Sequence, residues 1–354
     1  MAMDTSAAAA ATAPPPTYTR ERDVNPALAT YLASKKSKAI SGFKMVNSSP
    51  LRYAGGKSRA IGIILNALPA LAGRKIVSPF LGGGSVEIEL ANLGYQVEAY
   101  DIFDMLVVFW KELLANPELL GSALEKLTPT NEAFTRNRHI LLNYWEKVKP
   151  PELVYKTRNR LELTGAEKTL LDTSSLLQAA YYYYNMQLSY GPMFLGWPSS
   201  VYLNNAAKYQ GIVRRIKEFR CPKLSVNKQD FLETIPANPD AFLYLDPPYY
   251  LGADSKMFKG IYPNTNFAIH HDTFPHEKLR NTLHNHKSGF IMTYNDCPTI
   301  REWYQDYIFE FPRWHYSYGQ GETRVGNNRA DAAQGKEHIK ESHEIIIICP
   351  PQEQ

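Results

Sequence analysis

The sequence contains few cysteines, no long hydrophobic run and little excess of charge. Its three cysteines, Cys221, Cys297 and Cys349, are far apart and form no CxxC pair, which excludes a disulfide framework and the common zinc spacings. The longest strongly apolar run, residues 345–349, is far below the roughly 18 residues that a membrane-spanning helix needs. Lysine and arginine number 39 against 35 aspartates and glutamates, so the net charge of +4 excludes a polycation but permits a basic groove. We therefore expect a reduced, intracellular protein without a membrane span.

Apolar and aromatic residues are plentiful by contrast. Hydrophobic residues make up 44% of the 354 positions, enough for one large or two modest domains with a full core. Tyrosine is in excess, with 23 against 15 phenylalanines, and such an excess often marks a contact surface because tyrosine has an apolar face and a polar tip. Residues 1–20 are rich in alanine and proline without a basic flank. We expect a disordered tail there, not a secretory signal, followed by an extension over 21–47.

The hydrophobic pattern predicts an α/β fold. A short apolar strand covers 75–80, a glycine-rich loop 81–85, a helical stretch 86–93, and a second strand over 95–100 ends at Asp101. A parallel α/β sheet begins in this order. Further predicted strands cover 223–227, 241–245, 290–294, 308–318 and 343–349, predicted helices cover 60–71 and 275–286, and the region 104–217 is mainly helical with an irregular stretch at 189–203.

The loop of Gly82, Gly83 and Gly84 favours a nucleoside-type cofactor site. Glycines between a strand and a helix let the backbone approach a ligand, and an acid about 20 residues further on, here Asp101, can bind both hydroxyls of a ribose. A dinucleotide fingerprint would need a glycine where the sequence has Glu87, so the spacing suits S-adenosylmethionine better than a nicotinamide cofactor. A purely structural turn would show the same glycines.

Asp246, Pro247, Pro248 and Tyr249 directly follow the predicted buried strand 241–245. Two prolines end strand pairing and fix the backbone, so the Asp246 carboxylate and the Pro247 carbonyl project rigidly from the carboxyl edge of the sheet, where open α/β sheets bind ligands. Two such acceptors can bind both hydrogens of an exocyclic amino group and direct its lone pair at an electrophilic methyl group. Tyr249 can stack on the ring. The alternative is a mere strand-ending turn.

At these residues the sequence resembles the DNA adenine-N6 methyltransferases of the Dam type, the alpha class of amino-methyltransferases, over about residues 48–350. Residues 50–57 are similar to the family's amino-terminal S-adenosylmethionine motif, 78–85 to its glycine motif and 246–249 to its catalytic tetrad. The resemblance implies a Rossmann-like methyltransferase fold with a mixed, mainly parallel seven-stranded sheet and an inserted, mainly helical target-recognition domain. The cofactor-binding residues that it implies are Tyr53, Gly56, Lys57, Phe80, Gly82, Gly84, Ser85, Asp101, Asp230 and Phe231.

The resemblance also implies the reaction. A target adenine would leave the duplex, stack on Tyr249 and present its amino group to Asp246 and Pro247, and the methyl group would pass directly to nitrogen N6. This chemistry requires no metal and no covalent enzyme intermediate. Cys221 and Cys349 precede prolines instead of following them, which argues against methylation of a cytosine ring carbon. Cytosine N4 or RNA adenine as the substrate, an inactive DNA-binding homologue and a nicotinamide enzyme are the alternatives.

The resemblance places target recognition between the glycine motif and the tetrad. We assign residues 48–108 and 218–354 to the catalytic domain and 109–217 to a target-recognition domain for double-stranded DNA. Basic residues lie among aromatic ones there, and the candidate DNA-binding residues are Arg136, Arg138, Tyr184, Asn185, Tyr190 and Trp197. The opposing interpretation places tyrosines 181–184 in a helix core and the basic residues on a solvated helix face. Residues 193–198 depart from the form common to enzymes that methylate GATC, so the recognised sequence stays open.

Three further expectations concern metals, partners and location. Histidines are dense between His270 and His286, but their spacing matches no known ligand pattern, and we predict no metal site. The polar segment 319–340 fits either a loop that contacts DNA or a hairpin end. We expect a monomer or weak dimer that works with DNA in the cytoplasm or nucleoid. A cognate restriction endonuclease is a candidate partner that the sequence does not decide.

Overall fold

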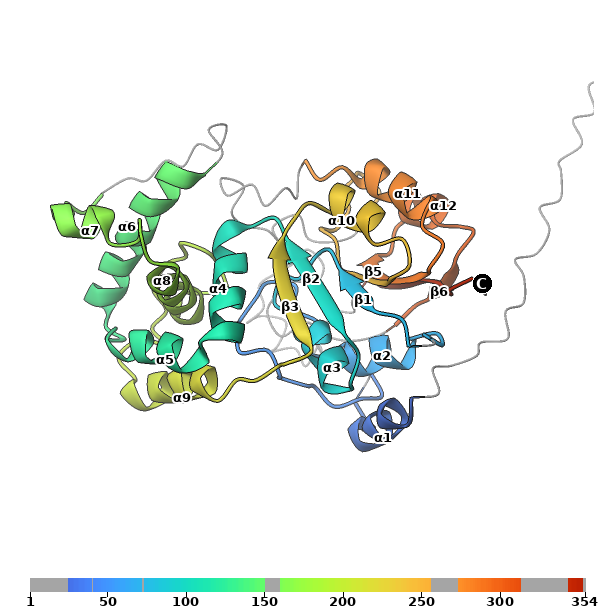
Figure 1. Cartoon of the computed structure of the whole chain (residues 1–354), viewed down its shortest axis with the longest axis horizontal. Helices are drawn as coiled ribbons and strands as arrows, with labels where there is room; N and C mark the ends of the chain where they lie inside the picture. Colours follow the sequence, from blue (N-terminus) through green and yellow to red (C-terminus); the bar gives the residue numbers. More distant parts are fainter. Residues whose placement is uncertain are drawn as a thin grey trace, which may run out of the picture.

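The computed structural model describes residues 25–39, 41–71, 73–149, 160–255, 273–312 and 343–352. The predicted tail 1–20, the segment 319–340 and His270 lie outside these residues. The described chain folds into a central sheet with helices on both faces and a further group of helices beside it (Figure 1). Within these ranges, none of the helices combines the length and the apolar character needed to cross a membrane.

The centre of the fold is a seven-stranded sheet with the order β3-β2-β1-β4-β5-β7-β6. Its strands are β1 (Ile76–Ser78), β2 (Val97–Asp101), β3 (Leu224–Lys228), β4 (Phe242–Leu245), β5 (Phe290–Asn295), β6 (Ile308–Glu310) and β7 (Glu344–Cys349). The first five are parallel, and β7 runs antiparallel to both β5 and β6. The strand order reverses between β1 and β4, which opens a crevice at their carboxyl ends. The predicted Rossmann-like fold with a mixed, mainly parallel seven-stranded sheet is confirmed.

Each face of the sheet carries its own hydrophobic cluster, because successive side chains of a strand point to opposite faces. In β7, Ile346 and Ile348 join the larger cluster, whereas Ile345 and Ile347 join the smaller one. The larger cluster contains residues of α2 (Ile61–Asn66), α3 (Ser85–Asn92) and α4 (Asp104–Ala115), and the smaller contains residues of α10 (Phe231–Ala237), α11 (His276–His284) and α12 (Pro298–Trp303). Burial on both faces explains why these strands are apolar runs without polar alternation.

A group of helices lies beside the sheet, past its edge strand β3 (Figure 1). It consists of α5 (Pro117–Glu125), α6 (Asn131–Val148), α7 (Gly165–Thr169), α8 (Ser175–Leu188) and α9 (Ala206–Lys217). Local sequence sets where they begin: Pro117 is the first residue of α5, and the side chains of Thr130, Ser174 and Asn205 cap α6, α8 and α9 by accepting backbone N–H bonds. Helix α1 (Pro26–Lys35) precedes the first strand in the sequence, and its Leu28 packs in the larger cluster.

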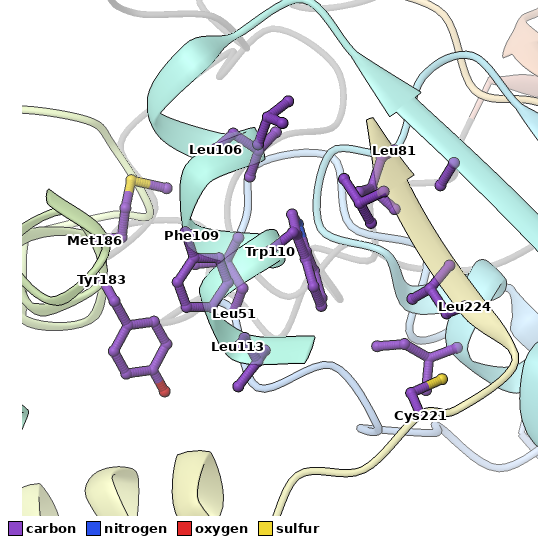
Figure 2. Packing of buried hydrophobic residues seen from close by; sticks show 14 of the residues in the cluster. Leu51, Leu81, Leu106, Phe109, Trp110, Leu113, Tyr183, Met186, Cys221 and Leu224 are labelled. Carbon is purple, nitrogen blue, oxygen red and sulfur yellow. The ribbon is translucent and has the colours of Figure 1, made fainter. Parts of the chain in front are cut away.

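Helix α4 joins this group of helices to the sheet. On one side, Phe109 stacks on Tyr183 of α8 with ring centroids 5.1 Å apart and planes 4° apart. On the other side, Trp110 faces Leu81 and the edge strand (Figure 2), and its indole N–H donates to the Gly82 carbonyl at 3.1 Å. These side chains belong to one buried cluster, so the sheet and the helices share a continuous core.

The predicted elements are present with shifted ends. Helix α2 ends at Asn66, whereas the periodicity predicts helix up to residue 71. Pro69 accounts for the difference, because proline cannot continue a helix and disfavours helical backbone in the residue before it. Strand β6 covers Ile308–Glu310, and residues 313–318 of that predicted strand lie outside the described residues.

The turn before β5 depends on glycine. Gly289 has φ +82°, and a Cβ there would lie 2.6 Å from the Cys349 carbonyl oxygen. We predict that Gly289→Ala lowers the free energy of unfolding by about 2 kcal/mol or more, measured by urea denaturation. Gly211→Ala in α9 is the control, because its Cβ would meet no atom within 4 Å and alanine suits a helix. Equal effects of the two substitutions would contradict the prediction.

Candidate active site

The carboxyl ends of the parallel strands bring the predicted site residues to one edge of the sheet. Strand β1 leads to the glycine loop, β2 ends at Asp101, β3 leads to Asp230 and β4 leads to Asp246. Two pockets open at this edge. They adjoin, because Phe80 and Pro248 line both.

All predicted catalytic and cofactor-binding residues line these two pockets. The first is lined by Tyr53, Gly56, Lys57, Phe80, Gly82, Gly84, Ser85, Asp246, Pro247, Pro248 and Tyr249. The second is lined by Phe80, Asp101, Asp230, Phe231 and Pro248, together with Ile102 and Phe274. The six candidate DNA-binding residues line neither pocket.

The glycine loop is shaped by neighbouring side chains of the protein. Gly82 and Gly84 have φ of +46° and +64°, a conformation that favours glycine. A Cβ at Gly82 would lie 3.0 Å from the Tyr53 ring, and one at Gly84 would lie 2.8 Å from the Trp110 ring. The glycines therefore serve close packing within the protein as well as any approach of a ligand.

Asp101 holds the same loop from the second pocket. Its carboxylate accepts hydrogen bonds from the backbone N–H of Gly82 at 3.1 Å and of Phe103 at 3.0 Å. Burial raises the pKa of Asp101, and these two hydrogen bonds oppose the rise. The carboxylate is thus fixed in orientation at the pocket wall, where each oxygen can accept a further hydrogen bond.

Three phenylalanines form the apolar wall of the second pocket. The ring centroids of Phe80, Phe231 and Phe274 lie 5.3 to 5.7 Å from one another. Asp230 stands beside them as the N-cap of α10 and accepts from the Leu232 N–H at 2.8 Å. Sequence reasoning missed Phe274, because no motif surrounds it and its only signal is an aromatic residue ahead of Pro275. The wall suits a flat, apolar ring with a polar edge near Asp230.

A buried lysine holds the carboxylate of the tetrad. Lys57 Nζ lies 2.7 Å from Asp246 Oδ1 and 2.9 Å from Oδ2, and it donates to the Gly55 carbonyl at 3.0 Å. The Thr293 hydroxyl donates to Asp246 Oδ1 at 2.7 Å. The Lys57 side chain is 3% exposed and that of Asp246 is 23% exposed, so the pair is partly withdrawn from water and opens toward the pocket through Asp246. Loss of one partner would leave a poorly solvated charge.

The end of β5 braces the rest of the tetrad. The Tyr249 ring stacks on Tyr294, with centroids 6.3 Å apart and an interplanar angle of 21°. Asn295 accepts from the Tyr250 N–H and donates to the Tyr250 carbonyl, both at 2.8 Å. Thr293 and Asn295 are fully buried. Alternate residues of one strand therefore fix both the carboxylate and the backbone that follows it.

Two buried glutamates border the ion pair. Burial raises the pKa of Glu87 on α3 to about 8, against hydrogen bonding from Ser78 at 2.7 Å. Burial also raises the pKa of Glu344 on β7 to about 8, against the charge of Lys57. Both glutamates are therefore largely protonated near neutral pH, which leaves Asp246 as the carboxylate that balances Lys57. Sequence reasoning gave neither residue a role, since a glutamate within an apolar run has no motif.

Two of the candidate DNA-binding residues, Tyr190 and Trp197, lie in a loop after α8. Ser189 and Pro198 pair in an antiparallel bridge, and the Tyr190 N–H donates to the Trp197 carbonyl at 2.7 Å. The side chains of Tyr190 and Trp197 are 71% and 67% exposed. Two large, mainly exposed aromatic residues thus face each other across a short loop closed by this bridge, which we call the 189–198 hairpin, and the Arg138 guanidinium carbon lies 4.7 Å from the Trp197 ring centroid.

The other four candidate DNA-binding residues make contacts within the protein, two of them to the backbone of this hairpin. Asn185 is fully buried and accepts from the Leu195 N–H at 2.7 Å, while Arg138 donates to the Leu195 carbonyl at 2.8 Å. Tyr184 is 1% exposed and donates to a backbone carbonyl at 2.6 Å. Their burial gives these three side chains a structural role in the described conformation. Arg136 is exposed and paired with a glutamate of α7.

The histidines do not form a metal centre in the part of the chain that the structure describes. No group of three or more histidine, cysteine, aspartate or glutamate side chains there could hold a metal ion. His276 instead shares a hydrogen bond with the Tyr294 hydroxyl, and burial lowers its pKa to about 4.

The α/β sheet, the crevice at its strand reversal and the proline-fixed carboxylate define an enzyme that acts on a nucleoside-type ligand. The family of D12 class N6 adenine-specific DNA methyltransferases matches residues 53–319, well over half of the chain. The chain belongs to this family, and it is an adenine-specific DNA methyltransferase. No curated protein matches it.

The buried glutamates predict how stability depends on pH. The pKa of Glu87 rises from 4.5 to about 8 on folding, so between these two pH values the folded chain keeps a proton that the unfolded chain loses. The free energy of unfolding therefore falls as the pH rises from 4.5 to about 8. We predict that Glu87→Gln reduces the loss of stability between pH 5 and 8 by on the order of a few kcal/mol, measured by denaturant unfolding.

Glu167→Gln is the control for this prediction. The hydrogen bond from Arg136 lowers the pKa of Glu167 to about 2, so this group stays charged throughout the window from pH 5 to 8. The substitution should leave the slope of stability against pH unchanged. A Glu87→Gln variant that keeps the wild-type slope would show that Glu87 is ionised in the folded protein.

Proposed function

We propose that the two adjoining pockets together bind S-adenosylmethionine as the methyl donor. The methionine end would lie in the first pocket near Tyr53 and Lys57, and the adenosine would lie in the second. The observation that carries this proposal is the junction of the pockets at Phe80 and Pro248, beside the carboxylate of Asp246. The family's activity requires a methyl donor, and the residues of the two pockets support S-adenosylmethionine as that donor.

The residues of the second pocket fit an adenosine group. Asp101 can accept hydrogen bonds from two ribose hydroxyls, because its carboxylate is oriented by the backbone of Gly82 and Phe103. Phe231 lies against the other two phenylalanines of the wall and offers an apolar face to a purine ring. Asp230 stands at the rim as an acceptor for an amino group.

The tetrad supplies the groups that act on the target base. The cofactor, when bound, supplies an electrophilic methyl group on a sulfonium. Asp246 and the Pro247 carbonyl would accept the two hydrogens of the adenine amino group, and Tyr249 would stack on the ring. Asp246 and the Pro247 carbonyl would thereby direct the lone pair of the amino nitrogen toward that methyl group, and Asp246 could accept the proton that nitrogen loses.

Lys57 and Thr293 orient the acceptor in this scheme. Thr293 and Lys57 both contact Oδ1 of Asp246, whereas Oδ2 receives only the longer of the two Lys57 contacts among those described here. The amino group of the target would then compete with Lys57 for Oδ2. A fixed carboxylate lowers the reorganisation needed when the base arrives.

We further propose that the region 109–217 recognises the target in double-stranded DNA, with 48–108 and 218–354 as the catalytic domain. The 189–198 hairpin supports this, because it presents Tyr190 and Trp197 to solvent. The assigned boundary at 108/109 lies within α4, the helix that packs against both parts. A restriction endonuclease as partner and a monomeric or weakly dimeric state stay predictions from the sequence.

Methyl transfer can be tested directly. The protein is incubated with labelled S-adenosylmethionine and unmethylated genomic DNA, which is then digested to nucleosides. We expect label in N6-methyl-2′-deoxyadenosine and none in a methylated deoxycytidine. DNA binding without transfer of label would contradict the proposed catalytic site.

Asp246→Ala tests the role of the tetrad. We predict that transfer at saturating S-adenosylmethionine falls by at least about 10³-fold, because the acceptor for the amino group is lost. The unpaired Lys57 should also lower stability, so thermal unfolding first confirms that the variant is folded under the assay conditions, and its binding of S-adenosylmethionine is then measured by calorimetry. Asp306→Ala, an exposed carboxylate outside both pockets, is the control and should keep full activity. Substantial transfer by Asp246→Ala would contradict the role.

Tyr190→Ala and Trp197→Ala test the hairpin. We predict weaker DNA binding by about 1 to 3 kcal/mol for each substitution, since aromatic side chains that contact bases contribute amounts of this size. Cofactor binding should be unchanged, because neither residue lines a pocket. Unchanged DNA affinity in both variants would place recognition elsewhere.

A further inference from the structure

The segment 47–57 lies between the helical region and the cofactor pocket and contacts both. From the helical side, Arg215 of α9 donates to the Ser49 carbonyl at 2.6 Å. Tyr183 and Gln187 of α8 both donate to the Pro50 carbonyl at 3.1 Å. The donors and acceptors are more than 130 positions apart in sequence, and each acceptor is a backbone carbonyl, so α8 and α9 fix the path of this segment.

The other side of the same segment shapes the pocket. The Ser49 hydroxyl donates to the Gly83 carbonyl at 2.5 Å, and the Tyr53 ring packs against Gly82 and Gly83. A few residues later, Lys57 reaches Asp246. A displacement of the segment would therefore move the glycine loop and the lysine that holds the carboxylate of the tetrad.

Arg52 lies where these two sets of contacts meet. Its Nη1 donates to the Gln187 carbonyl at 2.6 Å and lies 3.4 Å from the Ser189 carbonyl oxygen. Its guanidinium carbon stands 4.1 Å from the centroid of the Tyr202 ring, a cation–π contact. Arg52 thus binds the carboxyl end of α8, where the chain enters the 189–198 hairpin. The next residue in the sequence is Tyr53.

We propose that Arg52 is a positioning residue that makes DNA binding at the 189–198 hairpin and cofactor binding interdependent. The inference rests on the proposed function of the two pockets and of the hairpin. An ordered hairpin fixes the end of α8, Arg52 passes this constraint to Tyr53, and Tyr53 fixes the glycine loop. Because coupling between two sites is reciprocal, an occupied pocket favours the ordered hairpin to the same extent.

The test measures the dissociation constant of S-adenosylhomocysteine, which carries no transferable methyl group, with and without saturating short fragments of unmethylated genomic DNA. For the wild-type chain we expect DNA to tighten binding about fivefold or more. We call the dissociation constant without DNA divided by that with DNA the coupling ratio. In Arg52→Met the coupling ratio should fall to about one, and the dissociation constant without DNA should change by about twofold at most. The ratio obtained from DNA affinity with and without S-adenosylhomocysteine should agree.

Matched variants separate coupling from folding and from loss of charge. Tyr202→Leu removes the ring under Arg52 without touching the pocket and should lower the ratio, whereas Tyr202→Phe keeps the ring and should retain it. Arg214→Met removes an exposed charge from α9 and should retain the ratio. Thermal unfolding confirms that each variant is folded.

Several results would overturn the inference. A coupling ratio of one in the wild-type chain would overturn it, and so would a coupling ratio in Arg52→Met equal to that of the wild-type chain. Equal weakening of S-adenosylhomocysteine binding by Arg52→Met with and without DNA would leave Arg52 a purely structural residue. A wild-type chain that binds no S-adenosylhomocysteine would instead contradict the proposed function of the pockets, and the inference would fall with it.

Discussion

The ion pair between Lys57 and Asp246 is the interaction on which the site depends. It joins two segments 189 positions apart, and it brings an ammonium group that is almost completely buried against a carboxylate that opens to the pocket. Removing either partner would leave a charge with little water around it, which typically destabilises a protein by about 3 to 5 kcal/mol. Burial raises the pKa of both Glu87 and Glu344 to about 8, so these two neighbours of the pair add little negative charge near neutral pH.

The sheet places this pair, and the aromatic side chains around it keep it in place. Parallel strands deliver their carboxyl ends to one edge, so residues from four strands meet there without long connections. Trp110 and Tyr53 then pack on opposite parts of the glycine loop, and each needs the space that a missing Cβ provides. The first pocket is consequently an extension of the hydrophobic core, which limits how far its walls can move.

The sequence predicted the sheet because strand periodicity depends on local pattern, and the proline pair marks its carboxyl edge. The glycine loop, Asp101 and the tetrad were also recognisable locally, whereas the other cofactor-binding residues were expected from the family resemblance; all fourteen line the two pockets. Contacts between residues far apart in the sequence could not be predicted in this way. Tyr182, Tyr183 and Tyr184 are all buried although consecutive helical positions face different directions, because helices surround α8 on several sides. Asn185 and Arg138 resembled surface contacts, yet their partners are backbone groups of Leu195, which no local pattern reveals.

The contacts that hold the 189–198 hairpin are mostly made to backbone atoms. Asn185 and Arg138 bind the N–H and carbonyl of Leu195, and Arg52 binds the carbonyls of Gln187 and Ser189. Since nearly every residue type supplies the same backbone groups, the exposed side chain at position 190 can be exchanged without removing these anchors. Position 197 is more constrained, because the guanidinium carbon of Arg138 lies 4.7 Å from the centroid of the Trp197 ring. Under the proposed role of the hairpin in recognition, a new side chain at position 190 would change the contacts to DNA while the frame that carries it stays in place.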